Sequence, residues 1–197
     1  MNELPLFPLR AVLLPYGRMP LRIFEPRYVD LVRDCLKQEN EFGVVWIREG
    51  NEAVVDADSA MPKLAPIGCT ARIVDWDALP NGRLGITIEG RAKFRVLATQ
   101  QRANYLIVAD IETLPEEDAL AVPEHANDLT ELLRQLIAHP LVERLKLEPQ
   151  IADAGRMANQ IAQLLPIHEA SKFALLAETS PLQRLDRLLL ILEQLSD

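Results

Sequence analysis

The sequence predicts an α+β fold in two parts: residues 1–118 form a small β-barrel or sandwich with one early helix, and residues 119–197 form a helical bundle. Three observations support this prediction. Apolar and polar residues alternate in short segments before residue 113, which is typical of half-buried strands. The stretch LPEEDALAVPEH (114–125) then brings acidic residues and prolines, as in a linker. Beyond it, apolar residues recur in steps of three and four, which indicates amphipathic helices.

The N-terminal stretch FPLRAVLLPYGRMPLRIFEPRYV (7–29) predicts a strand, a loop, a second strand and the start of a helix. Pro8, Pro15 and Pro20 exclude one continuous helix, because each proline removes a backbone donor and pushes the preceding residue into extended geometry. Pro26 differs, since a proline is tolerated in the first turn of a helix, where its missing N–H is not needed. The apolar residues after Pro26 have roughly helical spacing, so we expect a helix to begin there.

Five further segments have strand patterns, which gives six or seven strands in total. The first is a β-branched and aromatic run, the next three alternate apolar and polar residues, and the last closes the region; they are 42–47, 67–73, 84–88, 92–96 and 105–113. Asn81-Gly82 has the favoured chemistry of a tight hairpin turn. Gly90 interrupts the alternation, so we expect separate strands on its two sides.

The C-terminal part has the start signals and apolar stripes of helices. Asp128 with Glu131, and Ser180 with Gln183, have the spacing of helix caps. Pro181 suits the first helical position. Two stripes follow the helical period: Met157, Ile161, Leu164 and Leu165, ended by Pro166; and Leu182, Leu185, Leu189 and Leu192, widened by Leu188 and Leu195. We expect both stripes to lie in the core of a bundle.

The composition favours a soluble, cytoplasmic protein. The 197 residues carry a net charge of −8, which disfavours a nucleic-acid backbone as the main partner. Cys35 and Cys69 lie far apart in apolar patterns, so we expect both to be buried rather than to bind a metal. The first residues lack the features of a signal peptide, and no apolar run approaches the roughly 18 residues of a membrane helix.

Motifs for catalysis or cofactor binding are missing from the sequence. No Gly-Lys pair offers a phosphate-binding loop, and His125, His139 and His168 are too scattered for a zinc site. None of the serines lies in a Gly-x-Ser-x-Gly elbow. We therefore expect a protein that is not an enzyme and that uses neither a cofactor nor a metal.

Two groups of residues remain as candidate binding sites. Arg91, Lys93 and Arg95 project from one side of a predicted strand and offer contacts to RNA phosphates. The alternative interpretation is the solvated face of a half-buried strand, which the acidic total charge favours.

The second group surrounds the apolar turn at Phe24 and comprises Arg22, Glu25, Arg27 and Tyr28. These residues form either a binding site or a structural corner made of an ion pair and a helix start. The sequence leaves both interpretations open.

Several motifs resemble, in chain order, the N-terminal domain of ATP-dependent Lon proteases. The most specific are LRIFEPRY (21–28), PIGCTARI (66–73) and NGRLGITIEGRAKFRV (81–96). Weaker matches are LPLFPL (4–9), YLIVADIETLPE (105–116) and the helical segments 156–167 and 172–195. The similarity therefore spans nearly the whole chain.

The resemblance implies a PUA-like pseudo-barrel followed by a helical bundle, acting as a recognition domain for unfolded or specific polypeptide segments. In this picture an apolar groove is lined by Tyr28, Trp46 and Trp76, and its shape or rim is fixed by Arg22, Glu25 and Arg27. The chain ends at Asp197, where Lon continues into an ATPase module and a peptidase, so we expect no proteolytic activity.

The partners that the resemblance implies are protein segments and a full-length ATP-dependent protease, together with weak self-association. Two alternatives stay open: an RNA-binding PUA-like module that uses the Arg91, Lys93 and Arg95 stripe, and a small-ligand sensor with a pocket at the barrel mouth. Similarity of fold alone does not decide between them, because function depends on the site.

Overall fold

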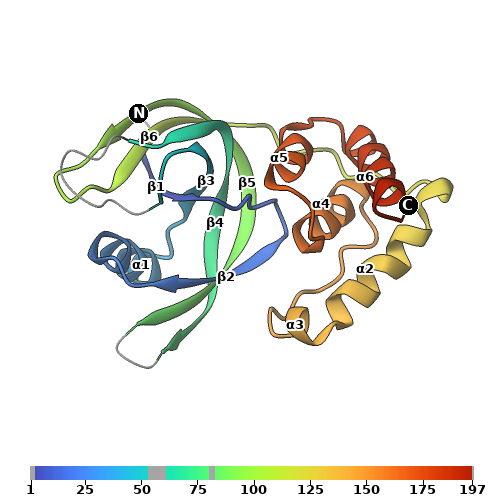
Figure 1. The fold of residues 1–197 in the computed structure, drawn as a ribbon, viewed down its shortest axis with the longest axis horizontal. Helices are drawn as coiled ribbons and strands as arrows, with labels where there is room; N and C mark the ends of the chain where they lie inside the picture. Colours follow the sequence, from blue (N-terminus) through green and yellow to red (C-terminus); the bar gives the residue numbers. More distant parts are fainter. Residues whose placement is uncertain (1–2, 53–60, 80–82, 197) are drawn as a thin grey trace.

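The computed structural model describes residues 3–52, 61–79 and 83–196. Its strands and first helix are β1 (Glu3–Leu9), β2 (Arg18–Ile23), α1 (Pro26–Gln38), β3 (Phe42–Glu49), β4 (Lys63–Ala78), β5 (Leu84–Gln101) and β6 (Ile107–Thr113). A short 3-10 turn, η2 (Glu124–Ala126), precedes α2 (Asp128–Ala138), α3 (Pro140–Glu143), α4 (Ala154–Leu164), α5 (Glu169–Ala177) and α6 (Pro181–Ser196). The sheet with α1 fills one side of the molecule, and α2 to α6 gather on the other (Figure 1).

The six strands form one sheet in the order β2-β5-β4-β3-β1-β6. β6 also pairs with β5, so five of the strands close into a ring. β1 and β3 are parallel, and the other pairs are antiparallel. β2 stands outside the ring and pairs with β5 alone among the described strands, so its second edge is open.

The structure corrects the prediction that Gly90 separates two strands. β5 runs without a break from Leu84 to Gln101, and only its register with β4 shifts near Gly90. Gly90 is needed for a close approach, because a Cβ there would lie 2.2 Å from the carbonyl oxygen of Leu14. The glycine thus marks the place where the loop after β1 crosses the strand. The predicted Asn81-Gly82 turn lies outside the described residues, although Ala78 and Leu84 pair on its two sides.

The loop between β1 and β2 joins the two sides of the molecule. Leu13 packs in the core beneath the sheet, whereas Val12 and Leu14 pack in the core among the helices. The Leu14 amide donates to Oε1 of Gln163 at 2.9 Å, and the Val12 amide donates to Glu169 at 2.6 Å. The loop between β1 and β2 therefore packs against both the sheet and the helices.

Local start signals explain most helix boundaries. α1 begins at Pro26 and α6 at Pro181, with the Ser180 hydroxyl accepting the Gln183 amide at 3.4 Å, as predicted. Asp128 is not a cap but the first residue of α2; the preceding Asn127 makes no side-chain capping bond. Among the described residues, no helix has the length and apolar character needed to cross a membrane.

The buried residues largely follow the predicted stripes. Met157 and Ile161 are fully buried, and in α6 Leu185 and Leu188 are buried, whereas Leu182 and Leu195 at its two ends are 41% and 56% exposed and lie outside the core. Both cysteines are buried as expected. Burial raises the pKa of Cys35 to about 11 and that of Cys69 to about 12, so neither is a reactive thiol at neutral pH.

Candidate functional site

The corner at the start of α1 is built around a buried arginine. The Arg27 side chain is only 6% exposed and forms an ion pair with Glu25, Nη2 to Oε2, at 2.8 Å. Its guanidinium also donates to the carbonyl oxygens of Tyr105 at 2.8 Å and Glu52 at 3.1 Å. These bonds tie α1 to two distant loops, so Arg27 and Glu25 hold the corner together.

Tyr28, which we expected to line a groove, is part of the same corner. Its ring stacks on the Phe7 ring, with centroids 4.0 Å apart. The Arg27 guanidinium lies over the Tyr28 ring, 4.5 Å from its centroid. Burial raises the Tyr28 pKa to about 12. Arg22, the fourth residue of the predicted group, lies on β2 and is exposed. The structure therefore separates Arg22 from the three residues that pack at the corner.

The two tryptophans occupy different environments. Trp46 on β3 is half-buried and packs against Phe173 of α5, with ring centroids 5.6 Å apart. It joins the sheet to the helices instead of lining an open groove. Trp76 on β4 is 59% exposed. Its strand neighbour Ile86 pairs in turn with Leu21 of β2, so Trp76 lies in the same register row as β2.

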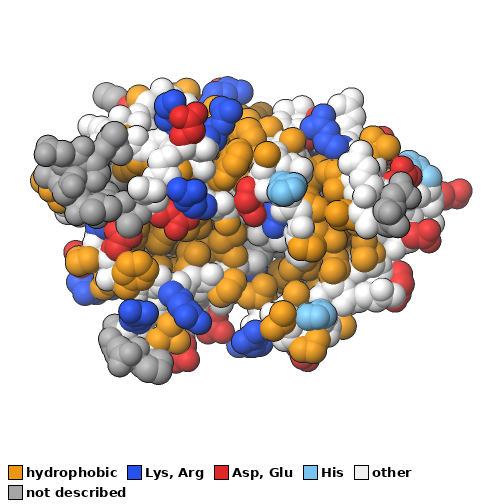
Figure 2. All heavy atoms as spheres, in the orientation of Figure 1, with side chains coloured by type: hydrophobic (Ala, Val, Ile, Leu, Met, Phe, Trp, Pro, Cys, Tyr) orange, Lys and Arg blue, Asp and Glu red, His pale blue; other side chains and the backbone are white. Residues whose placement is uncertain are grey.

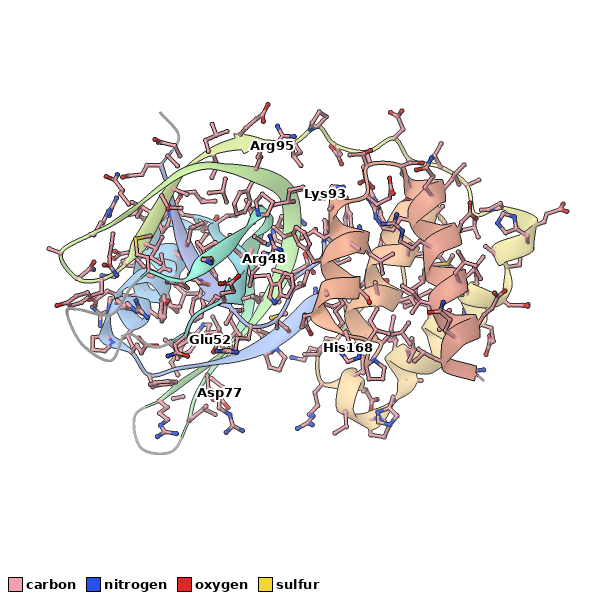
Figure 3. All side chains as sticks on the ribbon, turned by 45° about the horizontal axis from the view of Figure 1, so that its top comes forward. Arg48, Glu52, Asp77, Lys93, Arg95 and His168 are labelled. Carbon is pink, nitrogen blue, oxygen red and sulfur yellow. The ribbon has the colours of Figure 1, made fainter. Side chains whose placement is uncertain are left out.

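The predicted basic stripe is not one solvated face. Lys93 is 8% exposed and lies where β5 meets the helices, whereas Arg95 lies farther along the strand (Figure 3). Each cation has a carboxylate partner: Arg91 approaches Glu89 and Glu41, Lys93 bonds Glu117, and Arg95 bonds Glu112. Lys93 is buried where the linker and the segment after α5 cover β5, because its Nζ bonds the Glu117 carboxylate and the Glu178 carbonyl. The arrangement leaves no continuous row of unpaired cations for a phosphate backbone.

A buried ion cluster around Glu117 was missed from the sequence. Arg184 of α6 is fully buried and binds the Glu117 carboxylate with two nitrogens, one at 2.7 Å, while Lys93 binds the same carboxylate. Nζ of Lys93 also donates to the Glu178 carbonyl at 3.0 Å. Burial raises the pKa of Glu117, but the hydrogen bonds from Arg184 and Lys93 outweigh it and hold that pKa below its usual value. The cluster fastens sheet, linker and α6 together.

β2 has one edge that pairs with no other described strand. Its six residues, RMPLRI, include Pro20, a residue that sheets accept mainly in edge strands. Phe24 follows the strand directly and is 63% exposed, whereas the sequence pattern predicted it only as part of an apolar turn. Hydrophobic side chains also gather in the middle of the visible face, where β2 and the helices meet (Figure 2).

Two pockets adjoin along the boundary between the sheet and the helices, which we call the seam. The larger, about 390 Å³, lies against the 113–118 linker, and the smaller, about 300 Å³, lies beside the start of β2. Tyr16, Arg91 and Arg156 line both. Within the described part of the chain, no three His, Cys, Asp or Glu side chains gather as a metal site requires.

Comparison with known proteins gives a consistent family match. A model of the ATP-dependent protease La (LON) substrate-binding domain matches residues 3–194. The chain is 27% identical over 203 residues to the Lon protease of Brevibacillus choshinensis and 29% identical over 201 residues to Lon protease 2 of Myxococcus xanthus. The alignments cover 97% and 98% of this chain but 25% and 23% of those proteins. The chain thus spans about a quarter of these relatives.

Two solved structures have the same fold. A crystal structure of a Lon N-terminal domain protein from Xanthomonas campestris superposes with a TM-score of 0.72 and 31% identity, covering 96% of this chain and 98% of that chain. The N-terminal domain of the Mycobacterium avium complex Lon protease superposes with a TM-score of 0.62 and 13% identity, covering 95% and 96%. The second likeness concerns the fold alone.

Proposed function

The chain belongs to the family of ATP-dependent protease La (LON) substrate-binding domains, and we propose that it binds unfolded or extended polypeptide segments along the open edge of β2. The observation that carries the proposal is the pairing of β2, which has β5 on one side and no described strand on the other. An extended peptide binds such an edge through main-chain hydrogen bonds, largely regardless of its sequence.

Exposed side chains beside the edge and on the adjoining sheet supply further contacts. Phe24 directly follows β2 and is 63% exposed, which is high for a large aromatic residue, and Arg22 projects from β2 itself. Trp76 is 59% exposed and lies on β4, across β5 from β2, so we assign it to side chains of the segment that lie over the sheet. Burying an aromatic ring against a bound segment stabilises the complex by about 2 kcal/mol. Of the predicted residues, we retain Arg22 and Trp76 as peptide contacts and assign Glu25, Arg27, Tyr28 and Trp46 to supporting the surface.

The finer description extends the family assignment. We propose a PUA-like pseudo-barrel over residues 1–118 and a helical bundle over 119–197. We also propose a non-enzymatic role in the cytoplasm, with a full-length ATP-dependent protease as partner and weak self-association. An RNA-binding role has less support, because Arg91, Lys93 and Arg95 are each paired with a carboxylate.

Fluorescence anisotropy of a labelled, permanently unfolded polypeptide tests the proposal, with the folded form of that polypeptide as control. We expect saturable binding of the unfolded form alone. Phe24→Ser is expected to weaken binding about tenfold or more, since it removes a large apolar contact. Leu190→Ser on α6 is the matched control, because Leu190 is 59% exposed and lies on a different element.

Equal losses in the two variants would mean that apolar exposure in general, and not the β2 edge, drives binding. The absence of any binding by the wild-type protein would overturn the proposed function.

A further inference from the structure

The two seam pockets share an arginine whose charge is not matched by a carboxylate. Arg156 on α4 is half-buried, and its guanidinium lies 4.7 Å from the centre of the Tyr16 ring. Among the described residues it forms no ion pair and its guanidinium donates no hydrogen bond. A guanidinium carries five N–H donors, so Arg156 can receive an anionic group from a ligand.

The other cations around the smaller pocket are already engaged. Arg18 pairs with Glu89 at 2.7 Å, Arg91 approaches Glu89 at 3.4 Å, and Lys146 pairs with Asp75 at 3.1 Å. Arg156 therefore differs from its neighbours in having no acidic partner in the described part of the chain.

The charge around the smaller pocket also favours an anion. Four cations line it, Arg18, Arg91, Lys146 and Arg156, against the two carboxylates of Glu89 and Glu148. Glu89 is only 14% exposed and pairs with Arg18, Arg72 and Arg91. Asp75 and Glu41, which lie outside the lining, pair with Lys146 and Arg91. With these partners included, five cations still face four carboxylates, and Arg156 is the cation without an acidic partner among the described residues.

Tyr16 supports this arrangement through an uncommon backbone conformation. Its φ is 63°, in the left-handed region that residues other than glycine rarely adopt. The Tyr16 amide donates to the carbonyl oxygen of Gly90 at 2.9 Å, and its own carbonyl accepts from Gln160 at 3.2 Å. These bonds hold the ring in place beneath Arg156.

The smaller pocket lies at one end of the open edge. Arg18 is both the first residue of β2 and part of the pocket wall. A peptide that pairs antiparallel with β2 runs from Ile23 towards Arg18, so its carboxyl end arrives at the pocket. Antiparallel pairing is also the slightly more stable arrangement per residue.

The geometry points to recognition of the free C-terminal carboxylate of a polypeptide, with Arg156 as the residue that binds it while the preceding residues pair with β2. The planar guanidinium matches a carboxylate with two parallel hydrogen bonds, which gives orientation as well as affinity. This inference rests on the proposed function, since it places the carboxyl end of the segment bound to β2 at Arg156.

The test compares two peptides on the wild-type protein. Both have the same apolar sequence, long enough to span the six residues of β2, and an N-terminal fluorophore. One ends in a free carboxylate and the other in a carboxamide. We expect the free acid to bind about tenfold more tightly or better, because a hydrogen bond to a charged group is lost in the amide.

Variants then show which residue causes the difference in affinity between the free acid and the carboxamide. Arg156→Gln is expected to bring the affinity for the free acid down to that for the amide, while leaving the amide affinity unchanged. Arg134→Gln on α2, 52% exposed and outside both pockets, is the matched control and should preserve the difference. Glu148→Gln removes a negative charge from the pocket wall that repels the peptide carboxylate, so it should strengthen binding of the free acid.

The outcomes separate this inference from the proposed function. Equal binding of both peptides to the wild-type protein overturns the carboxylate site and leaves β2 recognition intact. Failure of both peptides to bind at any concentration overturns both. N-acetylalanine and inorganic phosphate serve as competitors: if either displaces the free-acid peptide at concentrations near the peptide's own Kd, the pocket binds small anions rather than a polypeptide terminus, and the inference fails.

Discussion

Two arginines each lie over a tyrosine ring, and their surroundings differ completely. At the corner, Arg27 lies 4.5 Å from the centre of Tyr28 and gives its hydrogen bonds to a carboxylate and two carbonyl groups. At the seam, Arg156 lies 4.7 Å from the centre of Tyr16 and has no acidic partner among the described residues. The same pair of side chains is thus tied into the fold in one place and lacks an acidic partner among the described residues in the other.

The difference follows from burial. A charge that is 94% removed from water must be paired, since an unpaired buried charge is very costly, and Arg27 meets that requirement within the chain. A half-buried charge keeps part of its hydration and can exchange water for a ligand. Mutations at the two sites should therefore separate stability from binding.

The largest loss of stability is expected for Glu117→Gln. This variant tests whether the seam, like the corner, contains buried cations that depend on a carboxylate partner. The change leaves the buried cations of Lys93 and Arg184 without their counter-charge, at a cost of about 3–5 kcal/mol of unfolding free energy. The matched control is Glu112→Gln, since Glu112 pairs with an exposed arginine and should cost below about 1 kcal/mol. Urea denaturation measures both; similar losses would contradict the account.

The next effect compares the two arginines directly. Arg27→Leu should destabilise the protein by about 3 kcal/mol, because it leaves a partly buried carboxylate and two carbonyl groups without their donor. Arg156→Leu should change stability by less than about 1 kcal/mol and should act on peptide binding instead. Chemical denaturation of the two variants and the wild-type protein is the measurement, and a larger loss for Arg156→Leu than for Arg27→Leu would contradict the difference in burial.

Acid provides a smaller and reversible test of the Glu117 cluster. The Glu117 pKa is lowered in the folded state, so its stabilising contribution is present above the unfolded value of about 4.3 and disappears as the pH falls through the folded pKa. The stability difference between wild type and Glu117→Gln should therefore shrink as the pH falls below about 4.3. Urea midpoints recorded down this range test the sign; a constant or growing difference would rule out the charge explanation.

Alkali gives the smallest expected effect, at the corner. The Tyr28 pKa is raised to about 12, so the folded state favours the neutral phenol; this contribution is complete below about pH 10 and is lost as the pH rises towards 12. Relative to Tyr28→Phe, the wild-type protein should lose stability above about pH 10 and not below it. Denaturation midpoints at mildly and strongly alkaline pH provide the check, and a parallel decline of both proteins would place Tyr28 in solvent.

The features that the sequence predicted correctly depend on neighbouring residues. Pro26 and Pro181 mark helix starts because their backbone constraint acts within a single turn. The alternation in 67–73 likewise predicted a strand, and β4 runs through it, but Gly68 to Ala71 are all buried instead of one face alone. These signals need no knowledge of the rest of the fold.

The features that the sequence did not predict depend on contacts between distant segments. Glu117 and Arg184 are 67 residues apart, and neither position has a local pattern that distinguishes it from a solvated charge. Gly90 was interpreted as a strand break because the local sequence does not show that the Leu14 backbone crosses the strand there. Similarly, Trp46 and Trp76 were grouped by residue type, yet one packs against α5 and the other is exposed.

Amide hydrogen exchange can show directly whether a polypeptide binds at the edge of β2. Exchange is recorded with and without a permanently unfolded polypeptide present at saturation. We predict slower exchange for the residues of Arg18–Ile23 other than Pro20, which has no amide hydrogen, and for the preceding turn at Tyr16, with no change in α6. Slower exchange confined to the helices, or unchanged exchange in β2 while the polypeptide is bound, would contradict the account.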